Sequence, residues 1–410
     1  MDETAPITAP AGGAPPRISV VMCAYRSAAT LPAAVASVLR QSCRDLELIV
    51  VDDASGDRSC EIVRGLSRAD ARVRLLSLQT NRGAAAARNR ALGIARGDWV
   101  AIVDSDDLIH PRRFERLIAA AEARGADMVA DDMVPFSDAP GTGGTTLFGG
   151  IAGGRARLIG AADFVRSDLR TGGGSLGYCK PLIRRSALGA TRYDEDIGIG
   201  EDFDFCLRLL MEGRPLLLWP DPSYLYRRHA GSASHRLSVE DVTQQIAAQD
   251  RLGRGPSAGE GALPPALAER RRRLGRALAY ERLVAAIKAR RALPALAHLS
   301  RRPSLAADLV RSLAERRRRR RLAKRPRGPE AIRLCLLAEG VAAPADGEGI
   351  ALTVPPLAAD RPASDHTGLA GRLAALHGAA PLLVTVRGAG ALHALGYLPG
   401  ARRIRVELLP

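Results

Sequence analysis

The sequence predicts an α/β fold with a mainly parallel β-sheet, and two observations support this prediction. Through the first 103 residues, short apolar runs rich in β-branched residues alternate with segments of helical spacing. Acidic residues directly follow two of these runs, at 52–53 and at 104–107. Strands that alternate with helices form parallel sheets, and such sheets bind ligands beyond the carboxyl ends of their strands. We therefore expect both acidic clusters at one ligand-binding edge.

Each element of this sheet follows from its own pattern. The apolar, β-branched runs predict strands at 18–24, 46–51, 73–78 and 99–103. The segments between them have helical spacing or a high alanine content, which predicts helices at 31–39, 60–67 and 83–95. Either Ser27 or Thr30 can cap the first of these helices.

Downstream of these strands, changes in composition divide the chain. Glycine and threonine predict a loop at 136–160, order resumes at 176–188 and 192–213, and a strand at 216–219 precedes a loop at 224–234. We expect four parts: a disordered leader (1–16), a main domain (17–250), a linker with an arginine-rich helical segment (251–328), and a small α/β module (329–410). The module has apolar runs at 331–337, 350–354 and 382–386 around a helix at 367–377.

The positive charge of the chain is concentrated in one segment. The 410 residues have a formal net charge of +16, and residues 269–327 alone hold 21 Lys+Arg against 4 Asp+Glu. The remainder is close to neutral, so the overall charge gives no argument for nucleic-acid binding by the first 268 residues. The N-terminus has no signal-peptide core, and no run approaches the ~18 apolar residues of a membrane span. Six scattered cysteines form neither a disulfide framework nor a zinc site, so we expect a cytoplasmic protein.

The D-S-D-D cluster at 104–107 has a direct chemical use. Mg²⁺ and Mn²⁺ take oxygen ligands, and Mg²⁺ is usually held by one or two carboxylates together with substrate phosphates. Carboxylates two residues apart at a strand end can point into the same pocket. Because acidic turns are common, the cluster becomes informative only together with other motifs.

Three ordered motifs provide that combination. They are ISVVMCAYRSAATLPAAVASVLRQSCRDLELIVVDDASGD, NRGAAAARNRALGIARGDWVAIVDSDD and YDEDIGIGEDFDFCLRLLMEG. Over about residues 18–235 the chain resembles the family-2 glycosyltransferases, which have the GT-A nucleotide-diphospho-sugar transferase fold. The stretch GYCKPLIRRSAL, followed by the third motif, most resembles glucosyltransferases of bacterial exopolysaccharide (succinoglycan-type) assembly.

The resemblance implies a binding site for a UDP-sugar donor. Asp53 would accept a hydrogen bond from the uracil ring. Asp104 would reach toward the ribose, and with Asp106 it would hold a divalent metal, Mn²⁺ or Mg²⁺, on the diphosphate. Asp52 and Asp107 would shape the site, and capping of their local turns is an equally open interpretation. The other residues implied in nucleotide-sugar binding are Ala24, Tyr25, Arg82, Gly83, Arg88 and Ser105.

Glu201 and Asp202 begin an apolar helix and would form the catalytic site. The resemblance makes Asp202 the general base, which takes the proton of an acceptor hydroxyl as that oxygen attacks the anomeric carbon. The alternative is helix capping, because acidic residues at a helix N-terminus gain about 0.3–1 kcal/mol from the helix dipole. Both roles can hold at once. A single displacement would invert the anomeric centre, so an α-linked donor such as UDP-glucose would give a β-glycoside.

Two further features bear on the reaction. His229, in YRRHAGSAS, stands where the family often has a histidine near the diphosphate, so it would bind the metal or the phosphate. A lone histidine is also often structural. The Q-x-x-R-W motif of processive polysaccharide synthases is missing. We therefore expect transfer of one sugar per encounter, to a hydroxyl of a glycan or a polyprenyl-linked oligosaccharide.

Residues 269–327 leave three interpretations open. Basic amphipathic helices attract anionic lipid, which would place the protein peripherally on the cytoplasmic face of the inner membrane. The same charge would bind nucleic acid nonspecifically, but Tyr280 is the segment's only aromatic residue, so base-stacking platforms are missing. The third interpretation is a solvated, arginine-biased helical linker.

Two other functions compete with sugar transfer. A sugar nucleotidyltransferase would have a glycine-rich loop with a basic residue after the first strand, and CAYRSAAT is no such loop. The other alternative is a non-catalytic basic adaptor for membranes or nucleic acid, built on a degenerate transferase domain. Such an adaptor would not need Asp106 and Asp202. We therefore predict a metal-dependent, inverting glycosyltransferase.

Overall fold

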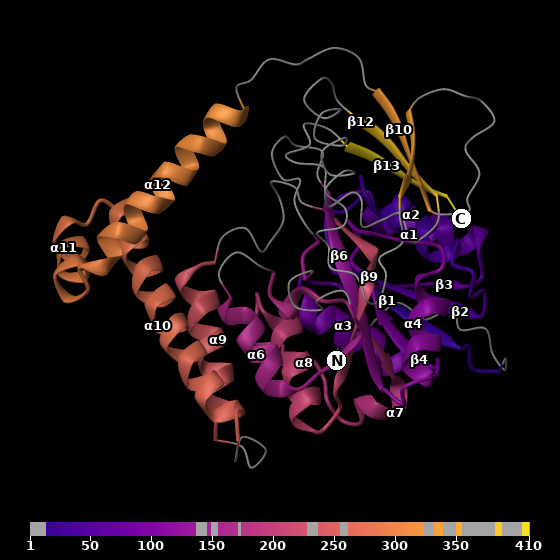
Figure 1. Ribbon diagram of the computed structural model, residues 1–410, viewed down its shortest axis with the longest axis horizontal. Helices are drawn as coiled ribbons and strands as arrows, with labels where there is room; N and C mark the ends of the chain where they lie inside the picture. Colours follow the sequence, from indigo (N-terminus) through magenta and orange to yellow (C-terminus); the bar gives the residue numbers. More distant parts are fainter. Residues whose placement is uncertain are drawn as a thin grey trace.

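A nine-stranded, mostly parallel sheet forms the centre of the protein (Figure 1). The computed structural model describes residues 14–136, 146–148, 155–170, 174–227, 237–254, 261–323, 332–338, 350–354, 382–387 and 404–409. The strand order is β3-β2-β1-β4-β8-β6-β9-β5, and β7 pairs with β9. The strands are β1 (Ile18–Ala24), β2 (Leu46–Asp52), β3 (Val73–Ser77), β4 (Trp99–Ile102), β5 (Leu108–Ile109), β6 (Met128–Phe136), β7 (Arg157–Ile159), β8 (Leu182–Arg184) and β9 (Leu216–Arg227).

Helices cover both faces of the parallel part of the sheet. Every residue of β2 is buried, as expected for a strand covered on both faces. The helices in the main domain are α1 (Leu31–Leu39), α2 (Ser59–Ala69), α3 (Gly83–Ile94), α4 (Arg113–Glu122), α6 (Ala161–Leu169), α7 (Arg185–Leu188), α8 (Glu201–Met211) and α9 (Val239–Leu252), with a short 3-10 turn at Leu176–Tyr178. These positions confirm the strands and helices that the sequence predicts through residue 103.

The order of the first four strands creates the ligand-binding edge. The chain runs from β1 to β2 and β3 on one side, and β4 then pairs with β1 on the other side. All these pairs are parallel, and the register places Ala24 beside Asp52. The residues after β2 and β4 therefore emerge on either side of the end of β1. A reversal of strand order of this kind is where open α/β sheets bind their ligands.

One expected loop is wrong over its first four residues, and the rest of it, 228–234, lies outside the described residues. The sequence predicts a loop over 224–234, but β9 continues through Arg227. Pro220 and Pro222 suggest that the strand ends near Trp219. In the structure, β6 follows β9 past these prolines through a register shift between Asp131 and Met133. Most of the loop expected at 136–160 lies outside the described residues, but the loop is wrong at its end, where Arg157–Ile159 form β7 and pair with β9.

A helical arm follows the main domain. It consists of α10 (Leu263–Lys288), α11 (Ala292–Arg301) and α12 (Ser304–Ala323), and Figure 1 shows it extending away from the sheet. The arm is anchored at its base, because Leu263, Ala266 and Leu267 of α10 belong to the main hydrophobic core. None of the helices described for this chain combines the length and the hydropathy that a membrane crossing requires.

The C-terminal strands form a second sheet. β10 (Ile332–Ala338), β11 (Ile350–Val354), β12 (Leu382–Arg387) and β13 (Ile404–Leu409) pair in parallel in the order β11-β10-β12-β13. Three of them coincide with the apolar runs found in the sequence, and β13 is an additional strand. The helix expected at 367–377 and most of the expected leader, 1–13, lie outside the described residues.

A buried carboxylate ties β2 to its neighbours. Glu47 accepts hydrogen bonds from Ser19 Oγ (2.7 Å), from the backbone N–H of Arg96 (3.0 Å) and from Arg74 (2.6 Å). Burial by itself raises the pKa of Glu47, but these hydrogen bonds outweigh burial and lower the pKa below its ordinary value of 4.5. The ionised form of Glu47 therefore stabilises the folded state.

Replacing Glu47 with glutamine should lower the free energy of unfolding at neutral pH by about 1–3 kcal/mol, because Arg74 loses its charged partner. A carboxylate with a lowered folded pKa contributes stability above its unfolded pKa and loses it as the pH falls through the folded pKa. Glu47→Gln should therefore lose less stability than the wild type as the pH drops below about 4.5. Urea unfolding across acidic pH measures this. Glu61→Gln, in the exposed Arg58–Glu61 pair, is the control, and identical pH profiles for Glu47→Gln and wild type would contradict the assignment.

Candidate active site

A cavity of about 1070 Å³ opens at the carboxyl ends of β1, β2 and β4. Its lining brings together most of the residues singled out in the sequence: Ala24, Tyr25, Asp53, Gly83, Arg88, Asp104, Ser105, Asp106, Glu201 and Asp202. Asp52 and Arg82 are not among the lining residues, and His229 lies outside the described residues. The three separate sequence motifs therefore meet in one cavity.

The Asp53 carboxylate fixes the start of α3. Its two oxygens accept the backbone N–H groups of Arg82 (2.7 Å) and Gly83 (2.8 Å). Gly83 has a φ of +85°, a conformation that glycine adopts without strain. The side chain of Arg82 points to Glu195, with 3.4 Å between Nη2 and Oε2. Asp53 thus places the N-terminus of α3 at the edge of the cavity.

The turns after β1 and β2 are strained and tied together. Arg26 (φ +50°) and Ala54 (φ +54°) have the left-handed backbone that residues other than glycine rarely adopt. Ser55 links the turns, because its hydroxyl accepts the Arg26 N–H (3.1 Å) and donates to Asp52 (2.5 Å). Asp52 thus shapes its turn, as the capping interpretation expects. Strain of this kind clusters at ligand-binding sites.

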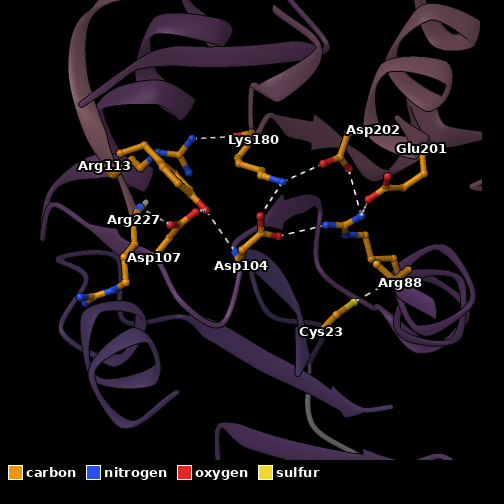
Figure 2. A network of polar contacts seen from close by, with 11 residues as sticks. Cys23, Arg88, Asp104, Asp107, Arg113, Lys180, Glu201, Asp202 and Arg227 are labelled. Atoms are coloured by element: carbon orange, nitrogen blue, oxygen red, sulfur yellow. Dashed lines mark hydrogen bonds and ion pairs between the residues drawn. The ribbon is translucent and has the colours of Figure 1, made fainter. Parts of the chain in front are cut away.

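Two buried cations connect the acidic groups of the cavity (Figure 2). Arg88 of α3 contacts Asp104 (3.0 Å), Glu201 (2.6 Å) and Asp202 (3.2 Å). Lys180, just before β8, contacts Asp104 (2.6 Å) and Asp202 (2.7 Å). Arg88 and Lys180 therefore each bridge the strand-end aspartate Asp104 and the helix-start aspartate Asp202.

The ionisation of these groups follows from their neighbours. Burial would raise the pKa of Asp104, but Lys180 and Arg88 outweigh it and lower that pKa to about 2. Burial and the neighbouring Asp202 raise the pKa of Glu201 above its ordinary value. The nearby carboxylates keep both cations charged: the pKa values of Lys180 and Arg88 are raised despite burial, which by itself would lower them.

Gly200 sets the start of α8 and so the position of Asp202. It has a φ of +96°, and a Cβ atom there would lie 3.1 Å from the side-chain nitrogen of Gln245 on α9. Both the backbone conformation and the close approach favour glycine. Glu201 and Asp202 then occupy the first turn of the helix, where the helix dipole favours negative charge.

Residues of β9 hold the 104–107 loop in place. The Asp107 side chain is fully buried, and it accepts hydrogen bonds from the Tyr224 hydroxyl (2.7 Å) and the Arg227 backbone N–H (2.7 Å). Burial and the adjacent Asp106 and Asp104 raise the pKa of Asp107 well above its ordinary value. Asp107 is therefore a structural support that orients the loop.

The same loop offers a set of oxygen ligands. Carboxylate oxygens of Asp104, Asp106 and Asp107 lie within 4.8 Å of one another. Asp104 and Asp106 border the cavity, whereas Asp107 does not. Carboxylate oxygens are the ligands that Mg²⁺ and Mn²⁺ prefer. The residues present therefore fit a divalent cation, with Asp104 and Asp106 on the side open to substrate.

Helix α10 forms another wall of the cavity. Its residues Arg270, Arg273, Leu274 and Ala277 are part of the lining. Arg270 is buried, pairs with Asp168 (2.9 Å) and stacks 3.8 Å over the ring of Phe203. Phe203 directly follows Asp202, so the first half of α10 packs beside the candidate catalytic helix.

Comparisons with known proteins agree with this geometry. Residues 19–182 match the sequence model of the family "Glycosyl transferase family 2". The chain is 35% identical over 240 residues to the succinoglycan biosynthesis protein ExoO of Rhizobium meliloti, covering 57% of this chain and 67% of that protein. It is 32% identical over 232 residues to ExoU of the same organism, covering 54% of this chain and 66% of ExoU. The crystal structure of S. aureus TarS 1–349 aligns with a TM-score of 0.50 at 18% identity, over 64% of this chain and 74% of that one.

The fold is thus that of the GT-A glycosyltransferases, a mainly parallel sheet covered by helices. The chain belongs to glycosyl transferase family 2, and it is a glycosyltransferase. This confirms the resemblance carried by the three sequence motifs.

Two features of the site were missed by sequence reasoning. Lys180 lies in a stretch that resembles the family, but it was given no role. The only signal was its rarity, because the chain has just three lysines among its 60 Lys+Arg. Nothing in the sequence marks Arg270 and Arg273 as cavity residues, because they lie in a run of four arginines.

Replacing Lys180 with methionine should lower kcat of donor turnover by about 100-fold, because Asp104 and Asp202 lose a shared positioning contact. The KM for the nucleotide-sugar should change far less than kcat, and Lys180→Arg should recover part of the rate. Steady-state release of nucleoside diphosphate measures both constants. Lys288→Met, an exposed lysine at the end of α10, is the matched control. Wild-type kcat in Lys180→Met would contradict the positioning role.

Proposed function

We propose that the chain transfers a sugar from a UDP-sugar, UDP-glucose or a similar donor, to a hydroxyl of a glycan or a polyprenyl-linked oligosaccharide. The observation that carries this proposal is the contact of Arg88 and Lys180 with both Asp104 and Asp202 in one cavity. The names of the relatives ExoO and ExoU support a role in exopolysaccharide biosynthesis.

The donor nucleotide is proposed to bind at the end of β1. Tyr25, Asp53 and Gly83 line this part of the cavity. Asp53, which holds the start of α3, is proposed to accept a hydrogen bond from the uracil ring. The Tyr25 side chain is 47% exposed, which leaves its ring available to a planar base.

A divalent cation, Mn²⁺ or Mg²⁺, is proposed to be held by Asp104, Asp106 and the donor diphosphate. When bound, it supplies positive charge that offsets the negative charge developing on the departing UDP. His229 stays a predicted third ligand. Asp107, Tyr224 and the Arg227 backbone keep the loop in shape for this role.

Asp202 is proposed as the general base. The acceptor oxygen forms a bond to the anomeric carbon, the bond from that carbon to the UDP oxygen breaks with its electron pair leaving on UDP, and the hydroxyl proton passes to Asp202. Arg88 and Lys180 hold the Asp202 carboxylate in one orientation. Because the nucleophile attacks opposite the leaving group in one step, the anomeric configuration inverts.

The arginine-rich arm is proposed to bring the enzyme to an anionic membrane surface. Residues 269–327 hold 21 Lys+Arg against 4 Asp+Glu, and each cation near an anionic surface contributes about 1 kcal/mol. A polyprenyl-linked acceptor lies in such a membrane, so the proposed position is peripheral on the cytoplasmic face of the inner membrane.

Asparagine substitutions should distinguish the proposed base, Asp202, from the proposed metal ligand, Asp106. Asp202→Asn should lower turnover by about 100-fold or more, because the base is lost, while UDP still binds. Asp106→Asn should lose the Mn²⁺ dependence of both turnover and UDP binding, because a predicted metal ligand is gone. The measurements are hydrolysis of a panel of UDP-sugars with Mn²⁺ and calorimetric titration with UDP.

The exposed Asp98 gives a matched control, and Asp98→Asn should behave like the wild type. The proposal fails if the wild type turns over no UDP-sugar, or if both active-site variants retain full Mn²⁺-dependent turnover. Loss of UDP binding in Asp202→Asn would instead assign Asp202 a structural role.

A further inference from the structure

The arm exposes an unusual number of large apolar side chains. The exposed fraction is 82% for Leu293, 61% for Leu296 and 67% for Val310, and Ile287 and Leu313 are also exposed. Elsewhere in the described residues, the exposed large apolar side chains are only Tyr25, Leu158 and Tyr178. We call residues 287–313 the docking arm.

Helical spacing aligns these side chains in pairs. Leu293 and Leu296 are three residues apart on α11, and Val310 and Leu313 are three apart on α12. Residues three apart lie on the same side of a helix. Helix α11 has no buried residue at all, so its leucines do not contribute to a core within the described part of the chain.

The docking arm nevertheless contacts α10. Asp308 of α12 pairs with Arg276 of α10 (2.7 Å), and Arg302 donates a hydrogen bond to the Gly275 carbonyl (3.3 Å). Leu305 at the start of α12 is fully buried. The apolar side chains are thus exposed on helices that are fixed to α10, at the end of the protein remote from the central sheet (Figure 1).

The charge around Leu293 and Leu296 has a single sign. The sequence has no acidic residue between Glu281 and Asp308. Lys288, Arg290 and Arg291 precede α11, Arg301 is its last residue and Arg302 follows it. Exposed leucines flanked by cations match a surface that is anionic outside and apolar below, which is a membrane of anionic lipid. A second copy of the same arm would bring like charges together, and nucleic acid would not require exposed leucines.

We propose that the docking arm inserts Leu293 and Leu296 between the acyl chains of an anionic membrane, while the flanking cations bind lipid headgroups. This deepens the electrostatic attraction proposed above, because apolar insertion persists at salt concentrations that screen charges. The inference rests on the proposed function in one respect: docking would serve to bring the cavity to a lipid-linked acceptor. Docking itself does not depend on sugar transfer.

Vesicle co-sedimentation of the full chain tests the proposal. The wild type should bind vesicles of phosphatidylethanolamine and phosphatidylglycerol in about a 2:1 ratio, and bind pure phosphatidylcholine much more weakly. The double variant Leu293→Ser/Leu296→Ser should bind the anionic vesicles about tenfold more weakly, with the difference retained at high salt. Arg290→Glu/Arg291→Glu should weaken binding mainly at low salt.

Leu158→Ser, an exposed leucine of the main domain, is the matched control and should bind vesicles like the wild type. Unchanged binding of Leu293→Ser/Leu296→Ser would overturn the proposal, and so would dimers that depend on Leu293 and Leu296, or preferential binding of nucleic acid by the wild type. UDP-sugar hydrolysis in solution should be the same in Leu293→Ser/Leu296→Ser and in the wild type. If vesicle binding fails while hydrolysis persists, the docking proposal falls and the proposed function stands.

Discussion

Arg88 and Lys180 each contact both Asp104 and Asp202, and the candidate active site depends on this arrangement. The two aspartates lie 98 positions apart in the sequence, one after β4 and the other at the start of α8. Lys180 and Arg88 are only 6% exposed in their side chains. Burying a cation costs several kcal/mol unless carboxylates compensate it, so the cations and aspartates stabilise one another's positions. The contact thereby fixes the catalytic helix relative to the strand edge.

The surrounding elements support this contact from several sides. Asp53 holds the start of α3, which carries Arg88, and Gly200 allows α8 to begin beside α9. Asp107 and Tyr224 hold the loop that carries Asp104 and Asp106. Several buried polar groups thus hold the site in one arrangement before substrate binds, which is the property of a preorganised site.

The fold was largely predictable from the sequence, because strands with β-branched residues alternate regularly with helices and end in acidic clusters. The site was predictable where a residue type matches a chemical task at a strand or helix end, as for Asp104, Asp106 and Asp202. Lys180 and Arg270 were not predictable, because their roles arise from contacts between distant segments. The extension of β9 past its prolines was missed for a related reason, since both prolines fall in an irregular stretch of β9 (220–223) that lies opposite the single residue Asp132 of β6.

The structure divides the arginines of the arm into two groups, which the sequence alone did not distinguish. Arg270 is buried between Asp168, Gln249 and Phe203 and so belongs to the catalytic domain. Further along the arm, the exposed residues Arg290, Arg291, Arg301 and Arg302 flank the exposed leucines of α11. The first half of α10 lines the cavity, and the docking arm is the part that we propose to bind the membrane.

A double-mutant cycle on donor turnover tests most directly whether Lys180 acts through Asp202. It compares wild type, Lys180→Met, Asp202→Asn and the double variant, each checked for folding by circular dichroism. We predict that the double variant is hardly slower than the slower single variant, which corresponds to a coupling energy of about 1–3 kcal/mol. Losses that simply add would contradict the account, because Lys180 and Asp202 would then act independently.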